Sequence, residues 1–497
     1  MRLDVSPRSW LAKATVVAIA VSCVIFPTPL RGQAEEYEYV PETDLLVLEK
    51  LETWQDLKLG LLMHWGPYSQ WGIVESWSLC SEDVPWCTRS MDDYGEYKKA
   101  YEALQTTFDP VQFDPKRWAR AARNAGMRYM VFTTKHHDGF SMFDTRQTDY
   151  RITSPDTPFS RHPRANVTRE LFDAFRTEGL MIGAYLSKPD WHSPDYWWPY
   201  FATPDRNPNY DIEKYPERWA RFVEFTHAQV QELMTEYGSV DILWLDGGWV
   251  QTMSDEEIRE RMNRPDYDFM RLQSQDIDMP RMVAEARALQ PGLIVVDRAV
   301  EGPHQNYLTP EARVPEMAIP HPWEVPMPMA QSWSFVPNDT YKSPRVLIHM
   351  LADVVAKGGN LLLNIGPGPD GSWHEAAYDR LEALGSWMRV NGEAIYGTRA
   401  IEPFTEGKIR LTQGKDGAVY AIYLADEGET DLPQAISMTQ LQPAPGATVA
   451  LLGSNATILL EKEGAGFVAR IPEGTPAPAQ HAWVLRISAI SEESSHF

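Results

Sequence analysis

The stretch Val240-Asp-Ile-Leu-Trp-Leu-Asp246-Gly-Gly-Trp249 is the part of the sequence that decides the fold. Its apolar run, residues 242–245, has the length of a strand buried on both faces, which is typical of a parallel sheet covered by helices. The run ends in Asp246, and burying a carboxylate costs free energy unless the group is paired, hydrogen-bonded or retained for a function. The two glycines let the backbone turn and leave space in front of it. At the carboxyl rim of a parallel barrel, Asp246 is a catalytic candidate, and a helix N-cap is the plain alternative.

Short apolar runs alternate with helical stretches from about Leu45 to Gly397. One helix is expected to begin after Asp114, with Pro115 at its first position and Gly126 just past its end. The other expected strands are residues 59–66, 129–134, 180–186, 293–296 and 360–365. This alternation predicts a (β/α) TIM-like barrel with loop insertions. A Rossmann-type sheet is less favoured, because no strand is followed by a glycine-rich phosphate loop.

The pattern changes near residue 400, where short strand candidates are separated by turn signals. These candidates are residues 409–412, 418–424, 457–460, 467–471 and 483–487. They predict a small all-β sandwich. The expected fold class is therefore α/β, with a TIM-like barrel over residues 35–399 and a C-terminal β-sandwich domain over residues 400–497.

Residues 1–34 have the features of a secretory signal peptide. Basic residues precede a mostly apolar run, residues 14–26, and small residues follow it. The run is too short to span a bilayer comfortably, so we expect a secreted or periplasmic protein with no membrane contact after cleavage. Only Cys80 and Cys87 would then remain, and one short-loop disulfide is plausible outside the cytoplasm.

Charge and aromatic content narrow the range of partners. The formal net charge is -23, from 69 acidic and 46 basic residues, which argues against binding to nucleic acids or anionic lipid surfaces. The chain has 18 tryptophans and 21 tyrosines. Aromatic rings of this kind fill large cores, and they also stack on sugar rings, so carbohydrate is a candidate ligand.

Polar residues gather at the expected strand ends, where a barrel would bring them to one pocket. Adjacent His136 and His137 would point to opposite faces of a strand, and no HExxH motif or Cys/His cluster is present, so no metal is expected. The sequence also lacks the GxSxG elbow of a serine hydrolase. No cofactor is expected, and carboxylate chemistry remains.

Glycoside hydrolysis needs two carboxyl groups, one ionised and one held protonated by its surroundings. Asp246 is the first candidate. Two downstream glutamates are candidates for the second, Glu311 in Thr-Pro-Glu311 and Glu324 in His-Pro-Trp-Glu324. Their plain alternatives are a glutamate in the first turn of a helix for Glu311 and a structural ion pair for Glu324.

Five motifs together resemble glycoside hydrolase family 29, the α-L-fucosidases. They are His64-Trp-Gly-Pro-Tyr-Ser69, Thr134-Lys-His-His-Asp-Gly-Phe140, Trp244-Leu-Asp-Gly247, Lys357-Gly-Gly-Asn-Leu-Leu-Leu-Asn-Ile-Gly-Pro367 and Asn391-Gly-Glu-Ala-Ile-Tyr-Gly397. The resemblance covers roughly residues 50–400. It implies an exo-acting, retaining α-L-fucosidase that removes terminal fucose from oligosaccharides or glycoconjugates by double displacement, on a barrel followed by a β-sandwich.

The same resemblance assigns roles to individual residues. It implies that Asp246 is the nucleophile and Glu311 the acid/base, with Glu324 in reserve. Glu75 and Trp77 match the family's Glu-Trp pair loosely, because Ser76 intervenes. The remaining expected sugar contacts are His64, Trp65, His136, His137, Tyr185, Trp244 and Arg298, and the fucose methyl group would need an apolar wall such as Trp65, Trp244 or Phe335.

Two other functions stay open at this point. The chain could be a fucose-binding lectin whose barrel has lost catalysis, or a fucosidase that acts on sulfated fucan fragments. Lys188, Arg298 or His192 could meet a sulfate in the second case. The linkage of the fucoside and the oligomeric state are not determined by these patterns.

Overall fold

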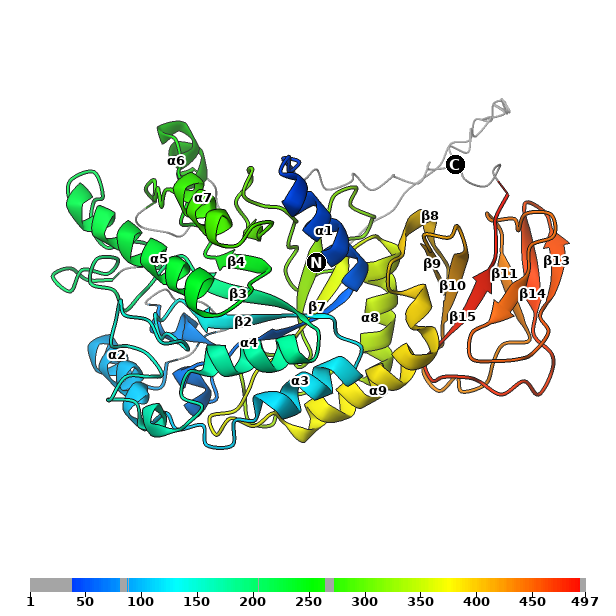
Figure 1. The fold of residues 1–497 in the computed structure, drawn as a ribbon, viewed down its shortest axis with the longest axis horizontal. Helices are drawn as coiled ribbons and strands as arrows, with labels where there is room; N and C mark the ends of the chain where they lie inside the picture. The colour runs from blue at the N-terminus through cyan, green and yellow to red at the C-terminus, as the bar shows by residue number, and fades with distance from the viewer. Residues whose placement is uncertain (1–37, 81–86, 88, 204, 264–271, 492–497) are drawn as a thin grey trace, which may run out of the picture. The chain divides into compact units, whose positions relative to one another are not determined.

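A parallel sheet of seven strands forms the centre of the N-terminal part of the chain (Figure 1), in the order β5-β4-β3-β2-β1-β7-β6. The computed structural model describes residues 38–80, 87, 89–203, 205–263 and 272–491. The strands are β1 (Leu59–Met63), β2 (Tyr129–Lys135), β3 (Met181–Ser187), β4 (Ile242–Asp246), β5 (Ile294–Asp297), β6 (Glu324–Pro328) and β7 (Asn360–Ile365). All neighbouring pairs are parallel, as expected for a barrel.

Alternate side chains of these strands fill the barrel interior. Leu62, Tyr185, Trp244 and Val296 come from four different strands and belong to one buried cluster. The register places Tyr185 beside Trp244 and Ser187 beside Asp246. Because successive strand residues point to opposite faces, Asp246 lies on the same face as Trp244, at the carboxyl end of β4.

The sequence patterns did not predict β6, since Pro326 and Pro328 interrupt it and proline is rare inside sheets. The strand lies at the edge of the described sheet, where a missing N–H is tolerated. Between β5 and β6 runs the irregular segment 305–308. Its Asn306 N–H donates to the Val295 carbonyl (2.9 Å), and its Leu308 carbonyl accepts from the Glu324 N–H (2.8 Å), so this segment links the two edges.

Helices lie outside the sheet, and α4 and α8 pack directly on strands β2, β3 and β7. The described α-helices are α1 (Leu45–Leu57), α2 (Tyr94–Glu102), α3 (Pro115–Asn124), α4 (Val167–Thr177), α5 (Pro216–Glu236), α6 (Asp255–Met262), α7 (Met279–Leu289), α8 (Pro344–Ala356) and α9 (Glu375–Asn391). Short 3-10 helices span Pro67–Gln70 (η1), Ser76–Leu79 (η2), Ala103–Thr107 (η3), Pro158–Arg161 (η4) and Gly392–Ala394 (η5).

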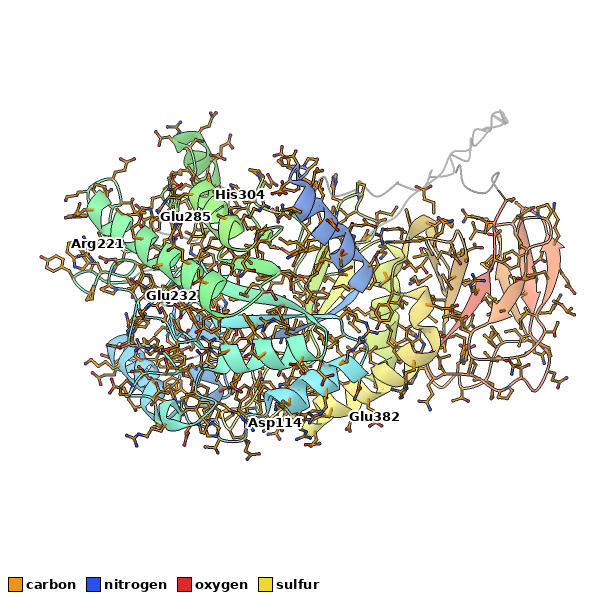
Figure 2. All side chains as sticks on the ribbon, viewed as in Figure 1. Asp114, Arg221, Glu232, Glu285, His304 and Glu382 are labelled. Atoms are coloured by element: carbon orange, nitrogen blue, oxygen red, sulfur yellow. The ribbon has the colours of Figure 1, made fainter. Side chains whose placement is uncertain are left out.

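The predicted start of α3 is confirmed. The Asp114 carboxylate accepts hydrogen bonds from the backbone N–H groups of Lys116 and Arg117, both at 3.1 Å, and Pro115 is the first helical residue. Figure 2 shows Asp114 at this end of the helix. Gly126 follows the helix with φ +95°, a conformation that favours glycine.

Two antiparallel sheets follow the barrel, as expected for a sandwich. One has the order β12-β15-β10-β9-β8 and the other β11-β14-β13. Their strands are β8 (Arg399–Glu406), β9 (Ile409–Gln413), β10 (Val419–Leu424), β11 (Ala435–Met438), β12 (Val449–Leu451), β13 (Leu459–Glu463), β14 (Gly466–Arg470) and β15 (Ala482–Ile487). One apolar cluster contains residues of both sheets, including Leu411, Leu485, Ile436 and Phe467.

The expected signal peptide, residues 1–34, lies outside the described residues. In the described part of the chain, none of the helices has the length and apolar character needed to cross a membrane. Cys80 is buried and Cys87 half-buried, and the structure has both as thiols, so the suggested disulfide is not formed.

Candidate active site

A pocket of about 450 Å³ lies at the carboxyl ends of the parallel strands. We call it the strand-end pocket. It brings together ten of the predicted site residues: His64, Glu75, Trp77, His136, His137, Tyr185, Trp244, Asp246, Arg298 and Glu311. They come from the first five strands and the loops that follow them, which is where side chains of a parallel barrel converge.

Asp246 is buried in this pocket and held by three donors. Its Oδ2 accepts from the Tyr185 hydroxyl (2.6 Å), and its Oδ1 accepts from Arg298 Nη1 (2.8 Å) and the Gly247 N–H (2.7 Å). Burial alone would raise the pKa of Asp246, but the Arg298 charge and the Tyr185 hydrogen bond outweigh burial and hold that pKa well below its usual range. The carboxylate is therefore ionised at neutral pH.

Arg298 connects two carboxylates. Its Nη1 contacts Asp246, and its Nη2 pairs with Oε2 of Glu311. The Glu311 side chain is 48% exposed, whereas that of Asp246 is 12% exposed. The planar guanidinium of Arg298 thus binds the buried carboxylate of Asp246 and the more exposed carboxylate of Glu311, and both residues line the same pocket.

The three histidines of the pocket are uncharged at neutral pH. Burial lowers the pKa of His64 to about 4 and that of His137 to about 3, and burial with the neighbouring His137 also lowers the pKa of His136. Each Nδ1 contacts a fixed partner: Asn364 Oδ1 for His64 (2.8 Å), Ser187 Oγ for His137 (2.8 Å) and Ser76 Oγ for His136. The Nε2 atom of His137 lies 3.8 Å from Oδ2 of Asp246.

The rings of His136 and His137 lie on the same side of the chain. They were expected to point apart, but β2 ends at Lys135, and both rings line the pocket with centroids 4.1 Å apart. With Asp246 they form a group whose possible ligand atoms lie within 4.8 Å of one another.

Glu75 also enters the pocket, from the turn before η2. Burial raises its pKa to about 7, with the charges of Glu311 and Asp246 adding to the effect. Its Oε2 is buried and has no hydrogen-bond partner among the described residues. Because Glu75 lines the pocket, its carboxyl group is a candidate partner for a ligand hydroxyl.

Trp65 and Phe335 lie elsewhere, so their expected sugar contacts are wrong. Trp65 is buried, packs against Trp118 and donates from Nε1 to the Gly368 carbonyl (3.0 Å). It follows His64 directly, and neighbours in an extended segment point to opposite sides. Phe335 packs against His374 and does not line the strand-end pocket.

Glu324 is buried away from the pocket. It begins β6 at the amino end of the sheet, whereas Asp246 ends β4 at the carboxyl end. It accepts from the hydroxyl of Tyr129 (2.6 Å) and from Nε1 of Trp244 (3.3 Å), and burial raises its pKa to about 7. Glu324 therefore holds the indole of Trp244 from the amino-end side of the sheet and cannot serve as the reserve acid/base.

Several lining residues were not predicted, among them Arg206, Trp249, Arg261 and Trp333. The Arg206 guanidinium lies 4.7 Å from the Trp77 ring centre and 5.2 Å from that of Trp249. Trp249 ends the stretch that decides the fold, so its position after the strand was a usable signal. Arg206 and Trp333 lie in long loops, where no periodicity indicates which side chain turns inward.

Comparisons with known proteins point to one family. The family model described as Alpha-L-fucosidase matches residues 28–393. An alpha-L-fucosidase of Branchiostoma floridae is 28% identical over 91% of this chain and 96% of its own length. The solved alpha-L-fucosidase isoenzyme 1 from Paenibacillus thiaminolyticus is 29% identical, with a TM-score of 0.71 over 90% of this chain and 100% of that one.

A third similar structure is an alpha-L-fucosidase from Bacteroides thetaiotaomicron, trapped as a covalent intermediate with 2-fluoro-fucosyl fluoride. Its sequence is 22% identical, with a TM-score of 0.67 over 93% of this chain and 99% of that one. At this identity the likeness concerns the fold.

Proposed function

This chain belongs to the alpha-L-fucosidase family, glycoside hydrolase family 29, and from that premise we propose how its pocket carries out the reaction. The enzyme hydrolyses terminal α-L-fucosides with retention of configuration, in two displacements at the anomeric carbon. A retaining mechanism needs a nucleophile and an acid/base group, both carboxyl groups. We assign these roles to Asp246 and Glu311.

In the first displacement a carboxylate oxygen of Asp246 attacks the anomeric carbon of fucose, and the bond to the leaving oxygen breaks. The observation that carries this assignment is the position of Asp246: ionised, buried, and at the carboxyl end of β4 inside the pocket. Tyr185 and Arg298 orient the carboxylate, and Arg298 keeps it charged until the covalent bond forms.

Glu311 donates a proton to the leaving oxygen as that bond breaks, and in the second displacement it takes a proton from the attacking water. The shared Arg298 supports this pairing, because a retaining mechanism needs its two carboxyl groups about 5–5.5 Å apart. The exposure of the Glu311 side chain also agrees with this role, because the leaving group and the attacking water both reach the site from the solvent side.

The neutral histidines and Glu75 bind the fucose hydroxyl groups. An uncharged imidazole can donate or accept a hydrogen bond without the desolvation cost of a buried cation. Trp244 lines the pocket with its ring stacked on Tyr185 at 5.1 Å, and its Nε1 is fixed by Glu324, so the indole gives the fucose methyl group an apolar surface.

The nucleophile is tested by Asp246→Gly. Removal of the carboxylate should lower kcat on an aryl α-L-fucoside on the order of 10³-fold or more, while circular dichroism should show that the variant stays folded. Added azide should restore turnover and yield β-fucosyl azide. Undiminished activity of Asp246→Gly would contradict the assignment.

The acid/base assignment is tested by Glu311→Ala, with Glu75→Ala as the matched comparison. Glu311→Ala should lower kcat/KM by about 10²-fold for fucosides with poor leaving groups and much less for 2,4-dinitrophenyl fucoside. Glu75→Ala should affect both substrates alike, because its contact is with fucose. The reverse pattern would assign the proton transfer to Glu75.

We also propose that residues 1–34 direct export and are then removed, which places the enzyme outside the cytoplasm. The charged start and the short apolar run support this proposal. A mature N-terminus near residue 35, measured by mass spectrometry, is the expected result, and an intact Met1 terminus would contradict it.

A further inference from the structure

Two arginines line the strand-end pocket and have no role in the reaction proposed above. They are Arg206, in the loop between β3 and α5, and Arg261, in the last turn of α6. The third arginine of the pocket, Arg298, is neutralised by its pairs with Asp246 and Glu311. Arg206 and Arg261 therefore add positive charge that the reacting groups do not account for.

We propose that Arg206 and Arg261 bind a sulfate ester on the fucosyl ring, so that the enzyme accepts sulfated as well as unsulfated terminal fucose. We call these two arginines the anion subsite. The inference rests on the proposed function, because it takes the strand-end pocket as the place of the fucosyl group. The sulfate is carried by the fucose itself and not by the leaving group.

Arg206 lies one aromatic layer away from a histidine assigned to a fucose hydroxyl. Its guanidinium is 4.7 Å from the ring centre of Trp77 and 5.2 Å from that of Trp249. Both indoles pack against the ring of His137, at 5.3 Å and 5.1 Å between centres. A sulfate ester extends a hydroxyl group outward, so an ester on the hydroxyl beside His137 would lie along the wall that Arg206 borders.

The packing of its own helix does not explain the position of Arg261. Helix α6 has no buried residue, yet the Arg261 side chain is half-buried and lines the pocket. Glu257, one turn earlier, is held in a capping box, where its Oε2 accepts from the N–H and the hydroxyl of Ser254 (2.6 and 2.7 Å). In the part of the chain that the structure describes, no carboxylate forms an ion pair with Arg261.

The wall that carries the anion subsite is fixed before any ligand binds, which favours a selective site. Gln275 is buried, and its N–H donates to the carbonyl of Gln251, which lines the pocket before α6 (2.9 Å). Its Oε1 lies 3.3 Å from the Tyr196 hydroxyl. That hydroxyl accepts from Nε1 of Trp249 (3.1 Å) and lies 3.0 Å from the carbonyl oxygen of Arg206.

The chemistry of the subsite suits a sulfate. The planar fork of N–H donors on arginine matches a tetrahedral oxyanion, and hydrogen bonds between charged groups are stronger than neutral ones. Glu75 is the carboxyl group of the pocket that Arg298 does not pair with. Burial raises the pKa of Glu75 to about 7, so below neutral pH this group is largely uncharged and does not cancel the arginine charges.

Two other residues that the sequence offered for a sulfate are paired inside the protein. Lys188 forms a buried ion pair with Asp297, and Nδ1 of His192 lies 3.3 Å from Oε1 of Glu102. Neither residue lines the strand-end pocket. A sulfate on the bound fucose would therefore meet the anion subsite and not these side chains.

The test uses 4-nitrophenyl α-L-fucoside and its 2-, 3- and 4-O-sulfates, which all share one leaving group. The unmodified enzyme should hydrolyse at least one of the sulfates with a kcat/KM no lower than that for the unsulfated fucoside. Arg261→Gln should lower the ratio of the two kcat/KM values, sulfated over unsulfated, by about tenfold or more. Arg259→Gln is the matched control, since Arg259 lies on the same helix, is exposed and does not line the pocket. It should leave this ratio unchanged.

Three results would overturn the inference. The first is hydrolysis of the unsulfated fucoside with none of the sulfates cleaved, which would leave the proposed function intact. The second is an equal ratio for Arg261→Gln and Arg259→Gln. The third is faster hydrolysis of the unsulfated fucoside in inorganic sulfate, with no turnover of the sulfated ones, which would assign the arginines to a free anion. Failure to hydrolyse the unsulfated fucoside would instead refute the proposed function, and this inference with it.

Discussion

Three carboxyl groups line the strand-end pocket, and their surroundings give them different properties. Asp246 contacts Arg298 and Tyr185 and stays ionised. Glu75 is buried near two other carboxyl groups, so its pKa rises to about 7. Glu311 is half exposed and pairs with Arg298. The residue types were readable from the sequence, but burial and neighbours, which set their protonation, were not.

Lys58 is a buried cation that does not line the strand-end pocket. It follows α1, and its Nζ has no hydrogen-bond partner among the described residues. Burial lowers its pKa to about 7, Arg399 and Lys415 add to this effect, and Asp56 and Glu52 oppose it. In the unfolded chain the pKa returns to its usual value near 10.5, so the unfolded state binds more protons between about pH 7 and 10.5. The cost to stability is largest at and below pH 7 and disappears as pH rises through this window.

We therefore predict that Lys58→Met stabilises the protein. One pKa unit corresponds to about 1.4 kcal/mol, so the gain at pH 7 should be about 1–3 kcal/mol after the loss of packing contacts. Thermal unfolding of both proteins at pH 7 and pH 10 is the measurement. The difference in unfolding temperature should be clear at pH 7 and should shrink at pH 10, and a difference that does not change with pH would contradict this account.

At the scale of elements, the position of Asp246 depends on the two strands beside its own. The Lys188 N–H donates to the Asp246 carbonyl (2.9 Å), and the Arg298 N–H donates to the Leu245 carbonyl (3.0 Å), so β3 and β5 clamp the end of β4. Lys188 and Asp297 form a buried ion pair across these flanking strands, with Nζ and Oδ1 2.5 Å apart. The sequence left Lys188 as one of three residues that could meet a sulfate, and the structure gives it this internal partner.

We predict that this pair positions the Asp246 carboxylate. Asp297→Asn should leave a buried lysine without its counter-charge and cost about 3–5 kcal/mol in the free energy of unfolding. The double variant Lys188→Met with Asp297→Leu should recover most of that stability, since apolar pairs can replace buried ion pairs. If the pair positions Asp246, kcat should stay reduced in the double variant while KM changes little. Full recovery of kcat would mean that the pair is only structural.

At the scale of the whole molecule, the sandwich is attached to two barrel helices, α8 and α9, by specific contacts. Arg410 of β9 pairs with Asp353 of α8, with Nε and Oδ1 2.5 Å apart. Trp387 of α9 donates from Nε1 to the Ala482 carbonyl (3.0 Å). These buried and half-buried contacts favour a bracing role for the sandwich.

We predict that Arg410→Ala lowers the thermal unfolding temperature by a few degrees, because Asp353 loses a half-buried partner, and leaves kcat/KM unchanged. Arg470→Ala is the matched control, since its pair with Glu461 lies within the sandwich and is more than half exposed. It should have no measurable effect on unfolding. A fall in kcat/KM on oligosaccharides for Arg410→Ala, with no change in unfolding temperature, would indicate glycan contact instead of bracing.

The sequence by itself determined that a barrel of alternating strands and helices precedes a β-sandwich, and it determined which residues lie at most strand ends. Periodicity is a local property, so apolar runs such as 242–245 and the Asp114 cap indicate strands and helices without knowledge of their neighbours. It failed at β6, where Pro326 and Pro328 hide a strand that only its pairing with β7 reveals.

Only the tertiary structure decided which polar residues share the pocket. Trp65 and His64 are adjacent in the chain, but only His64 lines the strand-end pocket, and Glu324 lies at the far end of the sheet from Asp246. Arg298 binds both Asp246 and Glu311, which are 65 residues apart in the sequence (311 − 246 = 65). Direction along a strand and contacts between distant loops depend on how the sheet closes, and no local pattern carries that information.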